Sequence, residues 1–241
     1  MRTQPPSNTI SQQLLLKIQL NEQASFDEFC WGDNTLLQRQ LMDLITKKSE
    51  DPLLYLWGSA ACGKSHLLQA CCHFINNSSA IYLPLKSLIE IGPEVLEGLD
   101  EQGIFCIDDI DAIAENRAWE EALFHLYNRI RDNGYGRIII SGTTPPAQTK
   151  IGLPDLRSRL SWGLVIQICA LHDDDKIRTL SQHAKRRGFH LPTHVANYLI
   201  THCSRNMHDL QQLLNDLDQA SLIAQRKLTI PFVKQVLHSH L

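Results

Sequence analysis

The sequence has no apolar run of the roughly 18 residues that a membrane-spanning helix needs. No apolar core follows the first residues, so nothing indicates a secretory signal peptide. Its seven cysteines include no C-x-x-C pair. An odd, scattered set of cysteines is typical of reduced thiols rather than of a disulfide framework. These absences favour a cytoplasmic protein without a membrane partner.

Several catalytic patterns are also absent. The sequence contains no G-x-S-x-G nucleophile elbow. Cys71-Cys72-His73 lacks the spacing of metal ligands, and Pro192 separates His190 from His194, which disfavours a zinc pair. The cluster at residues 185–187 is interpreted as the ordinary basic end of a helix rather than as a nucleic-acid site. Hydrolase and zinc chemistry are therefore disfavoured.

Charge is unevenly distributed along the 241 residues. The net charge is −3 overall, with −6 on residues 1–170 and +3 on residues 171–241. Eight of the eleven histidines also follow residue 170. This step in composition predicts three parts: a flexible polar arm at 1–22, a domain at 23–170 and a smaller domain at 171–241. The slightly acidic balance argues against a surface that binds DNA without specificity.

Short apolar runs alternate with helical patterns in the middle of the chain. The expected strands are 53–57, 80–83, 104–107, 138–140 and 164–168, with helices at 65–75, 93–99 and 118–131. Strands that are apolar on both faces and separated by helices predict an α/β fold with a five-stranded parallel sheet. After residue 171 only helical patterns remain, at about 173–187, 193–203, 207–224 and 231–237. They predict a small all-α lid.

A complete G-x-x-x-x-G-K-S motif directly follows the first expected strand and opens a helix. Its residues are Gly58, Ser59, Ala60, Ala61, Cys62, Gly63, Lys64 and Ser65, with His66 next on the helix. Backbone N–H groups of such a loop surround phosphates, and the helix N-terminus adds positive charge. Lys64 is the expected β/γ-phosphate contact, and the Ser65 hydroxyl is an expected Mg²⁺ ligand. The motif predicts binding of ADP or ATP.

Two acids end the third expected strand. Asp108 is the second expected Mg²⁺ ligand, and Asp109 is placed to orient an attacking water. Phe26 and Phe29, upstream of the loop, are the expected wall of a base pocket. A phosphate loop with such an acidic pair predicts a nucleotide site at the sheet's C-terminal edge.

Four segments resemble the Hda family of DnaA-related AAA+ proteins: 26–29 (FDEF), 126–130 (LYNRI), 152–163 (GLPDLRSRLSWG) and 225–234 (QRKLTIPFVK). The resemblance extends over residues 12–241 and implies an AAA+ αβα sandwich followed by a helical lid. It further implies a negative regulator of replication initiation that stimulates hydrolysis of DnaA-bound ATP to give inactive ADP-DnaA. The regulator would carry little ATPase activity of its own. The chain ends soon after the lid, so no helix-turn-helix domain is expected.

The same resemblance implies particular partner-binding residues. Gln13, Leu14, Leu16 and Ile18 resemble a peptide that docks on the sliding clamp, the β subunit of DNA polymerase III. DNA would then be reached only through the clamp. Arg159 matches the family's arginine finger, with Arg157 as the alternative. A homo-oligomer is left open for the resting protein.

Three positions depart from the family pattern. Lys17 replaces a common proline in the clamp peptide, and Thr143 leaves the sensor-1 role open between Ser141, Thr143 and Thr144. His208 replaces the lid arginine, and a neutral imidazole is a weaker γ-phosphate ligand than a guanidinium. This change favours ADP at least as much as ATP. The alternatives are an AAA+ adaptor that loads a replication protein without triggering hydrolysis, and a metabolic P-loop NTPase.

Overall fold

The structure is a computed structural model of the 241-residue chain. It describes all residues except 1–19, 23, 76–78, 100–102, 205 and 240–241. The chain divides into two compact units, with the boundary between Ile168 and Cys169. The sequence composition places this boundary at residue 170.

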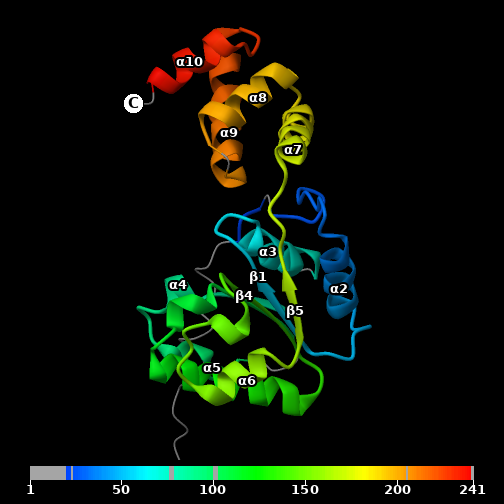
Figure 1. The fold of residues 1–241 in the computed structure, drawn as a ribbon, viewed down its shortest axis with the longest axis vertical. Helices are drawn as coiled ribbons and strands as arrows, with labels where there is room; N and C mark the ends of the chain where they lie inside the picture. Colours follow the sequence, from blue (N-terminus) through cyan, green and yellow to red (C-terminus); the bar gives the residue numbers. More distant parts are fainter. Residues whose placement is uncertain (1–19, 23, 76–78, 100–102, 205, 240–241) are drawn as a thin grey trace, which may run out of the picture. The chain divides into compact units, whose positions relative to one another are not determined.

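The first unit contains a five-stranded, wholly parallel sheet (Figure 1). Its strands are β1 (Leu53–Trp57), β2 (Ala80–Pro84), β3 (Ile104–Asp108), β4 (Arg137–Gly142) and β5 (Leu164–Gln167). The spatial order is β2-β3-β4-β1-β5, so β4 lies between the two strands that carry the expected nucleotide-binding residues. The predicted α/β fold with five parallel strands is confirmed.

Helices cover both faces of this sheet, because alternate strand residues point to opposite faces. One face packs on α2 (Thr35–Ile45) and α3 (Lys64–Phe74) through Leu54, Leu56, Cys106 and Ile139, among others. The other face packs through Tyr55, Phe105, Ile107 and Ile140 on α4 (Leu85–Leu88), α5 (Arg117–Asn133) and α6 (Pro154–Leu160). Three short 3₁₀ segments complete the unit: η1 (Pro93–Leu96), η2 (Ile110–Ile113) and η3 (Pro146–Gln148).

Several elements differ from the sequence expectation, chiefly the segment at Pro93 and helix α2. The segment that starts at Pro93 is a four-residue 3₁₀ turn rather than an α-helix to residue 99. Helix α2 was not expected, although Leu37, Leu41 and Leu44 follow helical spacing and are fully buried.

The second unit is entirely helical in its described residues. It consists of α7 (Asp173–Arg186), α8 (Thr193–His202), α9 (Met207–Ala224) and α10 (Ile230–Ser239). A core of its own includes Leu180, Leu199, Leu210 and Val233. Helix α7 carries three aspartates in its first turn, where acids are favourable, and Gly188 follows its end with φ of 85°. No helix in the described part of the chain has the length and apolar character needed to cross a bilayer.

Candidate functional site

The expected nucleotide-binding residues gather at one edge of the sheet. Gly58 follows β1, Asp108 is the last residue of β3, and Ser141 lies near the end of β4. Because the strands are parallel and adjacent in the order β3-β4-β1, their carboxyl ends meet at one edge. Ligands of open α/β sheets bind at this edge.

The P-loop, residues 58–65, forms a tight cradle that excludes side chains at two positions. A Cβ at Gly58 would lie 2.9 Å from Cys62 Sγ and 2.9 Å from the Ile168 carbonyl oxygen. Gly63 has φ of 102°, and a Cβ there would lie 2.6 Å from the Phe29 ring. The cradle therefore depends on glycine at both positions, as a loop that brings its backbone close to phosphates requires.

Lys64 is the cation of this cradle and is only 6% exposed. Its Nζ donates hydrogen bonds of 2.8 Å to Gly58 O and 2.9 Å to Ser59 O. These bonds hold the ammonium group inside the curve of the loop. Phosphate oxygens are anionic acceptors and form stronger bonds to an ammonium than carbonyls do, so the loop fits a phosphate group.

Both carboxylate oxygens of Asp108 accept hydrogen bonds from hydroxyl groups. Tyr82 Oη donates to Oδ2 at 2.7 Å, and Ser141 Oγ donates to Oδ1. The Tyr82 hydroxyl in turn accepts a 3.3 Å bond from Gln69 on α3. Burial, followed by the charge of Asp108, raises the pKa of Tyr82, so its hydroxyl keeps its proton and remains a donor. Tyr82 is not singled out by the sequence, because the pairing of β2 with β3 that brings its hydroxyl to Asp108 is decided by the fold.

The three candidates for the sensor-1 role have different environments. Ser141 is fully buried, and its Oγ also accepts a 2.9 Å bond from the Asp109 N–H. The Thr143 N–H donates to Asp111 Oδ2 at 2.7 Å, and the Thr144 carbonyl accepts from Tyr55 Oη at 3.1 Å. Of these three, Ser141 is the residue that hydrogen-bonds to the Asp108–Asp109 pair within the described part of the chain.

Asp109 occupies the left-handed backbone region, with φ of 56° and ψ of 55°. Burial raises the pKa of its carboxyl, and the charge of Asp108 adds to this effect. The positive charges of Lys64 and Lys86 act in the opposite direction. The ionised form of the Asp109 carboxylate is therefore destabilised, although the positive charge of the P-loop lysine acts on it.

Replacing Asp109 with asparagine should raise the free energy of unfolding at pH 7 slightly, by well under about 1 kcal/mol. Because folding raises this pKa, the ionised carboxylate of Asp109 opposes folding; this destabilisation is absent below the unfolded-state pKa and is fully present once the pH has risen through the folded-state pKa. Asparagine tolerates the same left-handed backbone. Denaturant unfolding from pH 3 to pH 8 measures the effect, and a difference that did not shrink at low pH would contradict it.

The oxygen donors near the loop fit Mg²⁺. Ser65 supplies a hydroxyl in the first turn of α3, and Asp108 supplies a carboxylate at the end of β3. Mg²⁺ keeps several waters and needs only one or two protein ligands. The described residues contain no group of three or more His, Cys, Asp or Glu side chains suited to a metal.

Aromatic side chains from the segment before α2 pack on the P-loop helix. The Phe29 ring lies 4.8 Å from that of Trp31 and 5.7 Å from that of His66, and the Phe26 ring lies 5.5 Å from that of Phe74. His66 Nε2 is 2.9 Å from the Ser25 carbonyl oxygen, and burial is the main cause that lowers the pKa of His66. The structure thus brings Phe29 and His66 together beside Gly63.

Arg159 lies near the end of the sheet where the strands begin, whereas its own P-loop lies at the end where the strands finish. It stands in the last turn of α6, and β5 begins at Leu164. A Cβ on Gly163 would collide with Leu53, so this segment passes the first residue of β1. The P-loop begins after Trp57, at the other end of the strand, a span of about 16 Å. In Figure 1, α6 and α3 lie at opposite ends of β1.

The guanidinium of Arg159 stacks on an exposed aromatic ring. Its Cζ lies 4.1 Å from the centroid of Trp162, whose side chain is 64% exposed. Arg159 Nη1 is buried and has no hydrogen-bond partner among the described residues. Arg157, the alternative, is an exposed residue of the same helix. Arg159 therefore holds an unused donor beside a surface aromatic.

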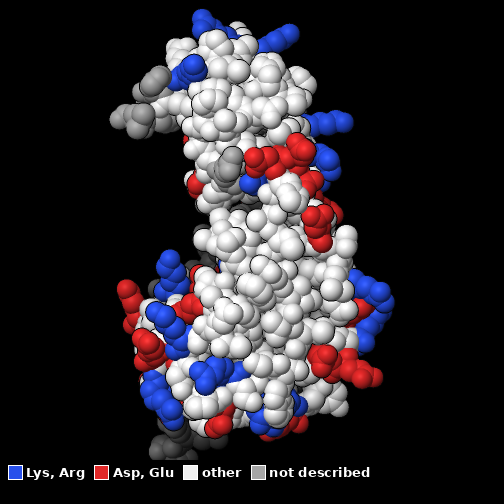
Figure 2. All heavy atoms as spheres, viewed as in Figure 1, with Lys and Arg blue, Asp and Glu red and all other residues white. Residues whose placement is uncertain are grey.

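Some expected site residues lie outside the described part of the chain. The clamp-peptide residues Gln13, Leu14, Leu16 and Ile18 fall in 1–19, and the side chain of His208 is not described. On the face drawn in Figure 2, Lys and Arg of the first unit alternate with Asp and Glu around a largely uncharged centre. The described part of that face carries no continuous basic patch of the kind that binds DNA.

The parallel sheet, the P-loop and the acid pair define a P-loop nucleotide-binding fold, and solved structures identify its type. Domain III of the replication initiation protein DnaA from Thermotoga maritima matches with a TM-score of 0.80 and 19% identity, covering 92% of this chain and 98% of that one. AMPPCP-bound DnaA from Aquifex aeolicus gives 0.66 and 19%, covering 81% and 66%. The Holliday junction branch migration motor RuvB from Thermotoga maritima gives 0.64 and 17%, covering 90% and 72%. The fold is that of AAA+ proteins.

Two family models match successive parts of the chain. The model for the bacterial DnaA ATPase domain matches residues 94–167, and the model described as "Hda, lid domain" matches residues 173–237. The chain is an Hda/DnaA-related AAA+ protein. The resemblance stated from the sequence is thereby confirmed at this level.

Proposed function

We propose that this chain binds adenine nucleotide and, in that state, stimulates hydrolysis of ATP bound to DnaA, acting as a negative regulator of replication initiation. The observation that carries the proposal is the position of Arg159, near the edge of the sheet opposite its own P-loop. A guanidinium there is suited to act on a nucleotide held by a neighbouring protein. The Hda-type lid and the DnaA-type ATPase domain support DnaA as that neighbour.

In this proposal the chain's own nucleotide site has a binding role. Lys64 would exchange its bonds to Gly58 O and Ser59 O for bonds to phosphate oxygens. Ser65 and Asp108 would hold Mg²⁺, which neutralises phosphate charge when bound. Phe29 and His66, which pack beside Gly63, would border the base. Adenine nucleotide is also bound by the similar Aquifex aeolicus DnaA, whose structure contains AMPPCP.

Arg159 would supply charge to the reaction on the partner. Its buried Nη1 has an unused donor, and its Cζ lies over Trp162 at the protein surface. A guanidinium placed against a γ-phosphate stabilises the charge that develops during phosphoryl transfer. The P-loop and acids of DnaA would carry out the hydrolysis.

The sliding clamp is the proposed second partner, reached through Gln13, Leu14, Leu16 and Ile18. Leucine and isoleucine anchors that enter a preformed groove provide modest affinity with few contacts. Docking on a DNA-loaded clamp would raise the local concentration of this chain near DnaA on DNA. DNA is then contacted through the clamp.

Replacing both Leu16 and Ile18 with alanine should weaken clamp binding by more than about 30-fold, because two buried anchors are lost. Nucleotide affinity and the unfolding temperature should not change. Surface plasmon resonance on immobilised clamp measures the effect, with Ser11→Ala as the matched control in the same arm. Unchanged clamp affinity in the double variant would assign the arm another role.

The function itself is tested with DnaA preloaded with labelled ATP. Adding this chain, nucleotide and DNA-loaded clamp should convert bound ATP to ADP faster than DnaA alone or DnaA with free clamp. Conversion at the unstimulated rate would reject the proposal. If DnaA were nevertheless recruited to DNA, the adaptor alternative would be favoured.

A further inference from the structure

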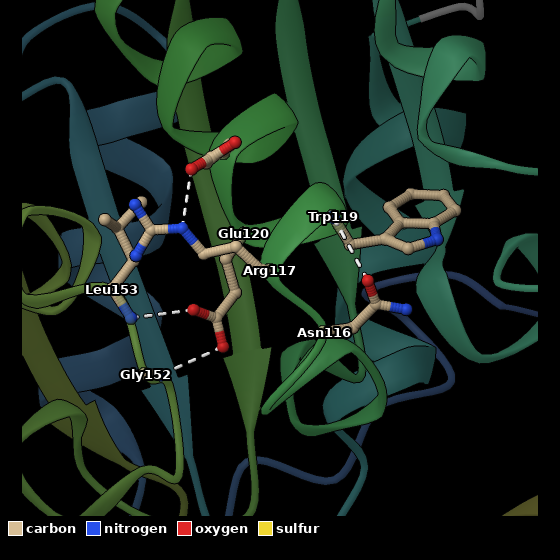
Figure 3. Close-up of polar contacts among 7 residues, drawn as sticks. Asn116, Arg117, Trp119, Glu120, Gly152 and Leu153 are labelled. Atoms are coloured by element: carbon tan, nitrogen blue, oxygen red, sulfur yellow. Dashed lines mark hydrogen bonds and ion pairs between the residues drawn. The ribbon is translucent and has the colours of Figure 1, made fainter.

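Glu120 is a buried carboxylate with an unusual set of partners. It lies on α5 and is 1% exposed. Its Oε1 accepts hydrogen bonds from the N–H groups of Glu115 and Gly152, both at 2.9 Å, and its Oε2 accepts from the Leu153 N–H at 2.7 Å. Figure 3 shows the carboxylate facing the backbone of Gly152 and Leu153. One side chain thus connects α5 to a segment more than 30 residues later.

These two N–H groups lie directly before α6, the helix that carries Arg159. Pro154 opens α6 and has no N–H, and the leucine side chain at position 153 offers no oxygen to cap the helix. Glu120 instead accepts from the two N–H groups just before the helix, so it anchors the chain that enters α6. Hydrogen bonds to a charged acceptor are stronger than those between neutral groups, so this attachment fixes where α6 begins.

Helix α6 is too short to hold its own position. It has seven residues, and isolated helices of this length are unstable in water. Two further contacts hold it: Leu156 and Leu160 are fully buried against the same core as α5. Apolar packing resists separation of the two helices but is non-directional, whereas the two bonds from Gly152 and Leu153 to Glu120 define the direction of the chain entering α6.

We propose that Glu120 is a positioning residue for Arg159: by fixing the start of α6, it holds the guanidinium in its place over Trp162. The effect of Glu120 on hydrolysis by DnaA rests on the proposed role of Arg159. Its effect on the position of the Arg159 guanidinium concerns this chain alone. Glu120 is buried and therefore out of reach of a partner protein, so its effect on the reaction is transmitted through α6.

The chain offers a matched control at the next residue. Glu121 is on the same helix, but its side chain is 47% exposed, and it pairs with Arg117 at the surface. Glu120→Gln and Glu121→Gln remove the same charge and have nearly the same volume. In Glu120→Gln an amide NH₂ would face at least one of the backbone N–H donors. Glu120→Asp keeps the charge with a shorter reach and serves as the second variant if Glu120→Gln folds poorly.

NMR of the full 27.4 kDa chain tests the geometry without any partner. In the wild type, the ring current of Trp162 should shift the Arg159 side-chain resonances, assigned with Arg159→Lys. Glu120→Gln should remove most of that shift and accelerate amide exchange at Gly152 and Leu153 by about tenfold or more, while Glu121→Gln should change neither. An unchanged Arg159 shift in a folded Glu120→Gln protein would overturn the proposal.

The stimulation assay tests the consequence for the reaction. Glu120→Gln should lower the maximal rate of DnaA-bound ATP hydrolysis at saturating protein by about tenfold, with less than a twofold change in the half-saturating concentration. Glu120→Asp should recover part of the rate. A normal maximal rate in Glu120→Gln would overturn the positioning role. A wild type that gave no stimulation would reject the proposed function, and the NMR result would still decide the geometry.

Discussion

Replacing Arg159 with alanine is expected to abolish the stimulation of DnaA-bound ATP hydrolysis, with a loss of about 10³-fold or more in the stimulated rate. The guanidinium lies over Trp162, near the end of β1 opposite the P-loop that begins at Gly58. In the proposed function it acts on a nucleotide held by the neighbouring protein and not on its own. The expected loss therefore appears in the reaction on DnaA and not in nucleotide binding by this chain.

The substitution should not impair folding. Arg159 Nη1 has no hydrogen-bond partner among the described residues, so no buried acceptor loses its donor there. The main loss is the stacking contact with Trp162, which is worth about 0.5–1 kcal/mol at an exposed site. Unfolding temperature and nucleotide and clamp affinity should therefore remain close to those of the wild type.

The decisive measurement uses DnaA preloaded with labelled ATP and DNA-loaded clamp, with ADP formation followed over time. Arg157→Ala is the matched control, because Arg157 is an exposed arginine of the same helix. Wild-type stimulation by the Arg159→Ala protein would reject action in trans by this residue. If Arg157→Ala lost the activity instead, the role would pass to Arg157.

Replacing Lys64 with alanine is expected to weaken binding of ADP and ATP by roughly 10- to 100-fold. Lys64 is the buried cation of the P-loop, and its two hydrogen bonds to loop carbonyls can be exchanged for bonds to phosphate. A hydrogen bond to a charged group contributes about 1.5–3 kcal/mol, which sets this range. Isothermal titration calorimetry in the presence of Mg²⁺ measures both nucleotides.

A control separates loss of the phosphate contact from loss of local charge. Lys86 is exposed on α4, and its charge also acts on Asp109, but it stands outside the P-loop. Lys86→Ala should therefore change nucleotide affinity by less than about fivefold, since exposed pairs contribute up to about 1 kcal/mol. Equal nucleotide affinity for wild type and Lys64→Ala would show that the nucleotide site is assigned wrongly.

Removing the Lys64 ammonium should also lower stability without ligand. The Gly58 and Ser59 carbonyls would lose a buried donor, at a cost of about 1–3 kcal/mol. Binding must therefore be measured well below the unfolding temperature of the variant. Excess nucleotide should then raise the unfolding temperature of the wild type more than that of Lys64→Ala, because stabilisation by a ligand follows its affinity.

Local sequence patterns determined the nucleotide-binding half of the candidate site. The order of residues 58–65 fixes a tight loop at a helix start, since only glycine avoids the contacts at positions 58 and 63. Strand 104–108 is apolar on both faces and ends in Asp108, so its place in a covered parallel sheet was readable. Such features depend on neighbours in the chain. Helix α2 was not predicted, although its leucines follow the same kind of local pattern and the sequence therefore contained the information.

Contacts between distant segments were decided only by the tertiary structure. Strand order brings Tyr82 and Ser141 to the two oxygens of Asp108, and no local spacing contains that order. The position of Arg159 across the sheet from Gly58 depends on β5 running parallel beside β1. Glu120 stands next to Glu121 with nothing in the local sequence to distinguish the two, and the fold places Gly152 and Leu153 against Glu120 alone. A buried carboxylate needs donors, and here the chain supplies two of them from more than 30 residues away, where periodicity along the sequence carries no information.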